Sequence, residues 1–211
     1  MTDPNFHIRT PRLYLSHLQP EDPDHCDFLA RLYNSPEFIA AEGETKIKTV
    51  RDAQEVISNR FRKDHARNGY GQYLLSKEPS DWDHTSASGS SHFGDDIKYH
   101  TLIGTVSLMR GEGPDAFSAP DLGFAILPEH MRKGYAREAC IGLMEDVERA
   151  LGQKDILGLH DPANKGSAAV FRSLGFKDMG LHVLKAFGGV TGQVWIKKDM
   201  DEDLKKYGFD E

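Results

Sequence analysis

Residues 121–136, DLGFAILPEHMRKGYA, join an apolar strand pattern directly to the start of a long amphipathic helix. A strand is predicted over 121–127, and Pro128 ends it. A helix is predicted over 134–151, because its apolar residues recur on one face. The first N–H groups of such a helix have no partner inside it and lie at the positive end of its dipole. The junction therefore predicts an anion-binding loop, for which phosphate is the common ligand.

The residues of this loop fit that use. Gly134 has no side chain to obstruct a ligand, and Ala136 is small. Arg132 and Lys133 add positive charge to a chain whose formal net charge is -7. An ordinary strand–loop–helix crossover with a glycine turn accounts for the same spacing. The chain lacks G-x-x-x-x-G-K-S/T, and it lacks G-x-G-x-x-G after its first strand, which argues against an NTPase and a Rossmann fold.

Apolar patterns on both sides of the junction predict the remaining elements. Helices are expected around Phe28–Leu32, from the capping-box pattern that opens at Thr49, and over Asn164–Leu174. Further strands are predicted over residues 13–18, 73–75, 101–109, 155–159, 183–184 and 194–196. This order favours a mixed sheet with helices on both faces.

The bulk properties limit the class of protein. A length of 211 residues is sufficient for one domain whose core needs no disulfide or metal. The net charge of -7 argues against general binding to nucleic acid or to anionic membranes. Only two cysteines are present, and neither a signal peptide nor an apolar stretch of roughly 20 residues is found. We therefore expect a soluble, cytoplasmic protein, with a nuclear location left open, and no required metal.

The domain organisation follows from a local change in composition. Residues 10–198 are expected to form a single domain. Residues 78–96 are rich in Ser, Asp, Gly and His and are predicted to be an exposed, flexible insertion. Residues 199–211 are expected to be a polar C-terminal tail. The sequence does not distinguish a monomer from a homodimer.

Three motifs in a fixed order resemble the GNAT N-acetyltransferases. Residues 131–136 resemble the family's Q/R-x-x-G-x-G/A segment, and the strand before them resembles its coenzyme-carrying strand. Residues 164–167 with 174–176 resemble its N-x-x-S…L-G-F segment, and residues 10–13, TPRL, resemble the opening of the RimJ/RimL-like branch. The resemblance spans residues 10–198 and implies an α/β (α+β) fold with a mixed, mostly antiparallel, twisted sheet of about seven strands.

The resemblance also implies which residues bind acetyl-coenzyme A as cosubstrate. Backbone groups of the loop would hold the pyrophosphate, and the strand before it would pair with the pantetheine arm. Asn164 would hydrogen-bond a pantetheine amide, although a helix N-cap is an equally good explanation for this residue. The implied coenzyme contacts are Phe124, Ala125, Ile126, Leu127, Met131, Arg132, Lys133, Gly134, Tyr135, Ala136, Asn164, Ser167 and Phe171.

The sequence departs from the family pattern at two positions. Met131 replaces Gln or Arg, which a backbone contact tolerates. Phe171 stands where many members have a tyrosine that protonates the departing thiolate, and phenylalanine has no proton to donate. Ser167 is a candidate substitute, directly or through water, and a capping serine is the alternative.

A general base would assist a protonated amine. The candidates are Glu42, Glu44, Glu129, His130 and His160, among which we select His160, at the end of a strand, and Glu44. The alternatives are structural hydrogen bonds for His160 and a solvated acidic loop for Glu42 and Glu44, and a water relay would need no base.

The predicted function is therefore that of a transferase: an N-acetyltransferase (acyltransferase) that moves an acetyl group from acetyl-CoA to a primary amine by direct attack. The acceptor is unidentified, and a protein N-terminus or a small-molecule amine would fit. Phe171 keeps open the alternative of a non-catalytic acyl-CoA-binding protein. A different nucleotide-binding α/β protein is a third possibility.

Overall fold

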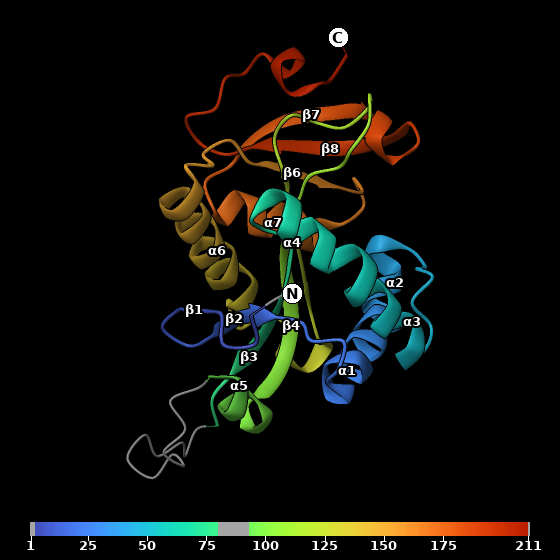
Figure 1. The fold of residues 1–211 in the computed structure, drawn as a ribbon. Helices are drawn as coiled ribbons and strands as arrows, with labels where there is room; N and C mark the ends of the chain where they lie inside the picture. Colours follow the sequence, from blue (N-terminus) through green and yellow to red (C-terminus); the bar gives the residue numbers. More distant parts are fainter. Residues whose placement is uncertain (1–2, 80–92, 211) are drawn as a thin grey trace.

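The apolar runs of the sequence form the eight strands of one sheet in the computed structural model, which describes residues 3–79 and 93–210 (Figure 1). The spatial order is β1-β2-β3-β4-β5-β6-β8-β7, and every neighbouring pair is antiparallel except β5 with β6. The strands are β1 (His7–Arg9), β2 (Tyr14–His17), β3 (Gln72–Lys77), β4 (Thr101–Met109), β5 (Asp121–Ile126), β6 (Leu157–His160), β7 (Lys177–Leu184) and β8 (Val190–Ile196). The predicted fold class is confirmed, with β1 as a strand that the sequence patterns did not indicate.

One helix begins at the capping box that the sequence predicts. The Thr49 side chain accepts from the Asp52 N–H while the Asp52 side chain accepts from the Thr49 N–H, which confirms the predicted capping box. The α-helices are α1 (Pro23–Tyr33), α2 (Pro36–Glu42), α3 (Val50–Val56), α4 (Arg62–Asn68), α5 (Phe93–Asp96), α6 (Tyr135–Leu151) and α7 (Lys165–Ser173). Short helical turns are η1 (Ile57–Phe61), η2 (Ile97–Tyr99), η3 (Pro128–His130), η4 (Lys185–Phe187) and η5 (Leu204–Tyr207). Every described helix is too short or too polar to cross a bilayer.

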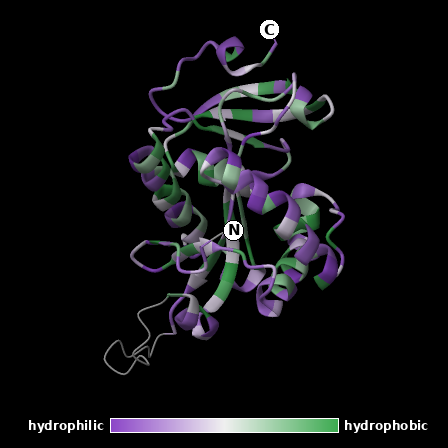
Figure 2. Cartoon of the chain, in the orientation of Figure 1, coloured by the Kyte–Doolittle hydropathy of each residue, from purple (hydrophilic) through white to green (hydrophobic). Residues whose placement is uncertain are grey.

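The two faces of the sheet are buried under different helices. One core lies under α6 and α7 and includes Cys140, Leu143 and Phe171. The other lies under α1, α3 and η1 and includes Phe28 and Ile57. Figure 2 shows hydrophobic colour along the central strands and hydrophilic colour on much of the outer helix surfaces, as expected for helices that bury one face. The prediction of helices on both faces is therefore confirmed.

The C-terminal segment corrects one expectation. Residues 199–211 were expected to form a polar tail, but Met200, Leu204, Tyr207 and Phe209 are buried in a third core against β6 and β8. The rings of Phe209 and Phe117 stack with centroids 4.3 Å apart. Apolar residues spaced through a charged segment carry no clear helix or strand period, so the composition concealed this packing.

The predicted insertion at 78–96 lies mostly outside the described residues, which resume at Phe93. Among the residues that are described at its end, Phe93 does not match an exposed segment. Phe93 is buried, and its ring stacks on Tyr14 with centroids 5.3 Å apart. The described residues at the end of the expected insertion therefore belong to α5, with Phe93 packed on the sheet.

The central strands part at one place. Strand β5 pairs with β6 at Asp121 and Leu157, and within the described part of the chain no other residues of these two strands pair. Beyond this point β6 continues beside β8, whereas β5 continues beside β4. In Figure 1 the ribbons of β7 and β8 run nearly across β4, so the sheet twists strongly. The parting leaves one edge of β5 open in the middle of the sheet.

Candidate functional site

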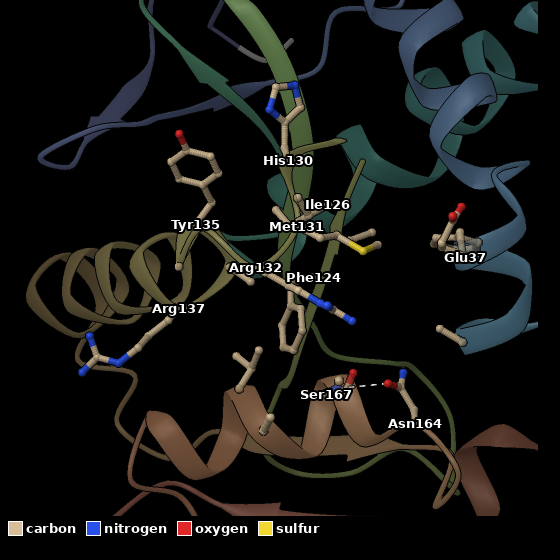
Figure 3. Close-up of a pocket in the computed structure, with 18 of the residues that line it drawn as sticks. Glu37, Phe124, Ile126, His130, Met131, Arg132, Tyr135, Arg137, Asn164 and Ser167 are labelled. Atoms are coloured by element: carbon tan, nitrogen blue, oxygen red, sulfur yellow. Dashed lines mark hydrogen bonds between the residues drawn. The ribbon is translucent and has the colours of Figure 1, made fainter. Parts of the chain in front are cut away.

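A cavity of about 630 Å³ lies where β5 and β6 part (Figure 3). Its walls come from α2, from β5 and the loop after it, from the first turn of α6 and from α7. The lining residues are Glu37, Phe38, Ala41, Glu42, Phe124, Ala125, Ile126, His130, Met131, Arg132, Gly134, Tyr135, Ala136, Arg137, Asn164, Gly166, Ser167, Ala169, Val170 and Ser173. Most of the residues predicted from the sequence to contact a coenzyme are thus brought together around one space.

The exposed edge of β5 offers backbone hydrogen-bonding groups to this cavity. The Leu127 N–H donates to the Ile103 carbonyl on the β4 side, at 2.9 Å. Because successive residues of a strand point their N–H and C=O groups to opposite sides, those of Phe124 and Ile126 point away from β4. Both residues line the cavity. An extended ligand arm laid in the parting would therefore find strand-like partners on Phe124 and Ile126.

The loop after β5 ends in an exposed helix N-terminus. Gly134 is the N-cap of α6 in the left-handed conformation, with φ 79°, and no side chain caps the helix. The first helical hydrogen bond runs from the Glu138 N–H to the Gly134 carbonyl, at 3.1 Å. The preceding N–H groups of Tyr135, Ala136 and Arg137 have no acceptor inside the helix, and all three residues line the cavity. This end of the cavity suits an anion such as a pyrophosphate.

Arg132 carries a conformational cost that the sequence did not reveal. Its φ is 60°, in the left-handed region that favours glycine. Its side chain lies over the cavity in Figure 3, whereas Arg137 points away from it. A positive charge is therefore held at the anion end at the expense of local backbone strain.

Asn164 and Ser167 stand at the opposite wall, at the start of α7. The Asn164 Oδ1 accepts from the Ser167 N–H at 3.0 Å, so Asn164 is a helix N-cap. The Asn164 Nδ2 donates to the Glu42 Oε1 at 3.4 Å, which links α7 to α2 across the cavity. Both Asn164 and Ser167 line the cavity, so the capping role does not exclude a contact with a ligand.

Three of the predicted coenzyme contacts lie outside the lining. Leu127 is buried, and its N–H is already bonded to Ile103. Lys133 turns its Nζ to the Glu129 carbonyl, at 2.8 Å. Phe171 is only 1% exposed and packs against the rings of Phe124, His160, Phe176 and Trp195. Its position is fixed tightly, because a β-carbon on Gly158 would lie 2.3 Å from the Phe171 ring. Phe171 is therefore a core residue rather than a lining residue.

The two bases selected from the sequence do not occupy suitable positions. His160 is buried, and both of its ring nitrogens are engaged. Its Nδ1 donates to the Asp161 carbonyl at 2.7 Å, and its Nε2 accepts from the Trp195 Nε1 at 2.9 Å. Glu44 is exposed, lies outside the cavity lining and pairs with the Lys48 Nζ at 3.0 Å. His160 is thus structural, and Glu44 lies on the surface.

Other titratable groups lie closer to the cavity. Glu42 lines it, and desolvation together with the nearby Asp161 carboxylate raises the pKa of Glu42, against the lowering effect of the hydrogen bond from Asn164. His130 also lines the cavity, and desolvation lowers its pKa, so the imidazole is neutral near pH 7. Glu129, the remaining candidate, is exposed and does not line it. Glu42, His130 and Glu129 were all candidate bases in the sequence, which gave no reason to prefer one of them.

Asp121 was missed by sequence reasoning. It opens β5 at the point of parting, on the same face as Gly123 and Ala125, and its Oδ1 accepts from the Leu159 N–H at 3.0 Å. Burial, helped by the charge of Glu42 and opposed by the hydrogen bond from Leu159, raises the pKa of Asp121 to about 8. An acidic residue that opens an otherwise apolar strand was the available signal.

The comparisons with known proteins agree with this geometry. A family model described as an acetyltransferase (GNAT) domain matches residues 12–177. A search of curated proteins found no match. Among solved structures, an acetyltransferase from Agrobacterium tumefaciens is similar with 22% identity and a TM-score of 0.62, covering 92% of this chain and 95% of that one. A ribosomal-protein-S5-alanine acetyltransferase from Vibrio fischeri has 17% identity and a TM-score of 0.66, covering 93% and 99%.

A third solved structure contains the cosubstrate. It is a microcin C7 self-immunity acetyltransferase in complex with acetyl-CoA and AMP, with 14% identity, a TM-score of 0.64, and coverage of 89% of this chain and 92% of that one. The fold and the site define an acetyl-CoA-dependent acyltransferase. The chain belongs to the GNAT acetyltransferase family.

Proposed function

We propose that this protein transfers the acetyl group of acetyl-CoA to a primary amine by direct attack of the amine on the thioester. The parting of β5 and β6 over the cavity carries this proposal, because it puts an open strand edge next to an exposed helix N-terminus. The strand edge suits the amide-bearing pantetheine arm, and the helix N-terminus suits the pyrophosphate. The N–H of Phe124 or Ile126 would also stabilise the oxyanion of the tetrahedral intermediate.

The reaction must remove a proton from the amine nitrogen and supply a proton to the departing thiolate. The amine nitrogen forms a bond to the acetyl carbon, the bond to sulfur breaks, and the amine gives up a proton. Glu42 is our candidate for the proton acceptor, since its carboxylate lines the cavity and its pKa is raised. Because Phe171 is a core residue, the departing thiolate would take its proton from Ser167 or from a water molecule beside it.

The acceptor is proposed to be a cationic amine. Carboxylates from two parts of the fold lie at or near the parting: Glu37 and Glu42 on α2 line the cavity, and Asp161 follows β6 and raises the pKa of Glu42. Such a surface attracts an ammonium group, which loses one proton to become the attacking amine and a second when the amide forms. Protein N-termini belong in the acceptor panel, since several structures of similar fold are ribosomal-protein acetyltransferases.

Thiol release from acetyl-CoA tests the proposal. Purified protein is mixed with acetyl-CoA and a panel of polyamines, amino sugars and peptides with free N-termini. We expect release above the hydrolytic background with at least one amine, together with acetylated product by mass spectrometry. Binding of acetyl-CoA without turnover on any amine would favour the alternative of a non-catalytic acyl-CoA-binding protein.

A variant of Ser167 separates binding from chemistry. Ser167→Ala removes the hydroxyl, while its backbone N–H still donates to Asn164. We expect kcat to fall about tenfold or more, with little change in the dissociation constant for acetyl-CoA. An unchanged kcat would assign the protonation of the thiolate to water alone.

A further inference from the structure

Arg12 connects the N-terminal segment to the anion-binding loop through three kinds of contact. Its Nε pairs with the Glu138 Oε2 at 2.6 Å, in the first turn of α6. Its Nη1 donates to the Lys133 carbonyl at 3.0 Å. Its Cζ lies 4.7 Å from the centroid of the Tyr135 ring. One guanidinium thus holds the loop before Gly134 and the helix after it.

The turn before β2 is itself anchored on the same carboxylate. The Thr10 Oγ1 donates to the Glu138 Oε1 at 2.7 Å, and the Arg12 N–H donates to that oxygen at 2.8 Å. Burial opposes ionisation of Glu138, but the hydrogen bonds from Thr10 and Arg12 outweigh it and lower the pKa of Glu138. The carboxylate is therefore charged at neutral pH and fixes the Arg12 backbone as well as its side chain. Two residues of the TPRL sequence at 10–13, Thr10 and Arg12, thus connect the N-terminal segment to α6.

The hydrogen bond to Lys133 has a consequence for the cavity. In a trans peptide the C=O of one residue and the N–H of the next point in opposite directions. Arg12 draws the Lys133 carbonyl toward the N-terminal segment, so the Gly134 N–H points the other way. Gly134 and the two residues after it line the cavity. A carbonyl turned inward would instead repel a phosphate.

We infer that Arg12 is a positioning residue for the coenzyme pyrophosphate, a role that rests on the proposed acetyl-CoA site. It acts from behind the loop, by holding the Lys133–Gly134 peptide with its N–H toward the cavity. Lysine would not replace it, because the contact needs a planar fork that bonds two acceptors while stacking on an aromatic ring. The left-handed backbone at Arg132 is strained, and the contact from Arg12 to the Lys133 carbonyl supports the loop beside it.

The test compares two ligands that differ by the pyrophosphate. Binding of coenzyme A and of pantetheine, which lacks the nucleotide and both of its bridging phosphates, is measured by calorimetry for the wild type, Arg12→Met and Arg12→Lys. We expect Arg12→Met to weaken coenzyme A binding by about tenfold and to leave pantetheine binding within about twofold. Arg12→Lys, which keeps the charge and the aliphatic stem, is expected to resemble Arg12→Met.

Arg9→Met is the matched control, since Arg9 lies in the same N-terminal segment and stacks on Tyr14, with Cζ 5.5 Å from that ring centroid. It should leave both affinities unchanged. Equal losses for coenzyme A and pantetheine would overturn the inference, because they would indicate a general structural effect, and so would full affinity in both Arg12 variants. A wild type that binds no coenzyme A would instead refute the proposed function.

Discussion

Replacing Gly134 by valine tests the anion-binding loop with a built-in control. Gly134 has φ 79° at the start of α6, and Gly152 has φ 69° at the C-terminal end of the same helix. A left-handed conformation costs an L-residue about 1–2 kcal/mol, and more for a β-branched one. A β-carbon at Gly152 meets no atom within 4 Å, and one at Gly134 meets only the Arg12 Nη2, at 3.4 Å. We therefore expect both variants to lose a similar free energy of unfolding, about 2 kcal/mol.

The two variants should differ in coenzyme binding. A valine side chain at Gly134 would displace the phosphate from at least one N–H group, and a charge-assisted hydrogen bond is worth about 1.5–3 kcal/mol. This corresponds to a loss of affinity of about 10-fold to 150-fold. Urea denaturation measures the stability of both proteins, and calorimetric titration with acetyl-CoA measures affinity. Equal affinities in Gly134→Val and Gly152→Val would refute the assignment of the loop.

Three further predictions concern residues around the site and the N-terminal segment. Trp195→Phe leaves the buried His160 Nε2 without its hydrogen-bond donor. The free energy of unfolding, measured by urea denaturation, should fall by about 1–3 kcal/mol, while kcat stays near the wild-type value. A large loss of kcat would instead support His160 as the general base. The folded pKa of Asp121 is raised to about 8, so folded protein holds more protons than unfolded protein between about pH 4 and 8, and stability should fall as pH rises through that window. In denaturation series at pH 5 and pH 8.5, Asp121→Asn should reduce the difference in stability between the two pH values. An unchanged difference would contradict a raised pKa of Asp121 in the folded protein. Desolvation, together with the neighbouring His65, lowers the pKa of His17 to about 4, so stability should fall as pH drops from about 6.5 to 4. In denaturation series across this range, His17→Phe should remove most of that loss.

Local signals in the sequence predicted the parts of the site that local chemistry determines. The strand before the loop, the glycine at the start of α6 and the capping sequence at Asn164 all lie where they were expected. Each depends on residues within a few positions of one another, such as Asn164 and Ser167. The same holds for the capping box at Thr49.

Long-range contacts account for most of what the sequence did not reveal. Arg12 and Glu138 are 126 positions apart, and His160 and Trp195 are 35 apart, so no local pattern announces either pair. His160 has the side-chain type and the strand-end position of a candidate base in the sequence, but in the fold Trp195 occupies its Nε2. The sequence motif places Phe171 near the coenzyme, but it does not show whether the side chain lines the cavity or lies in the core beneath it. That depends on packing, which buries Phe171 in the core.

Hydrogen exchange at the β5 edge tests the central claim most directly. Backbone amide exchange is followed by NMR for the protein alone and with saturating coenzyme A. Coenzyme A should slow exchange at Phe124 and Ile126, which face the parting, and at Tyr135 and Ala136 in the first turn of α6. Leu127, whose N–H is already bonded to Ile103, should change little. Unchanged exchange at Phe124 and Ile126, or protection confined to another surface, would contradict a coenzyme site between β5 and β6.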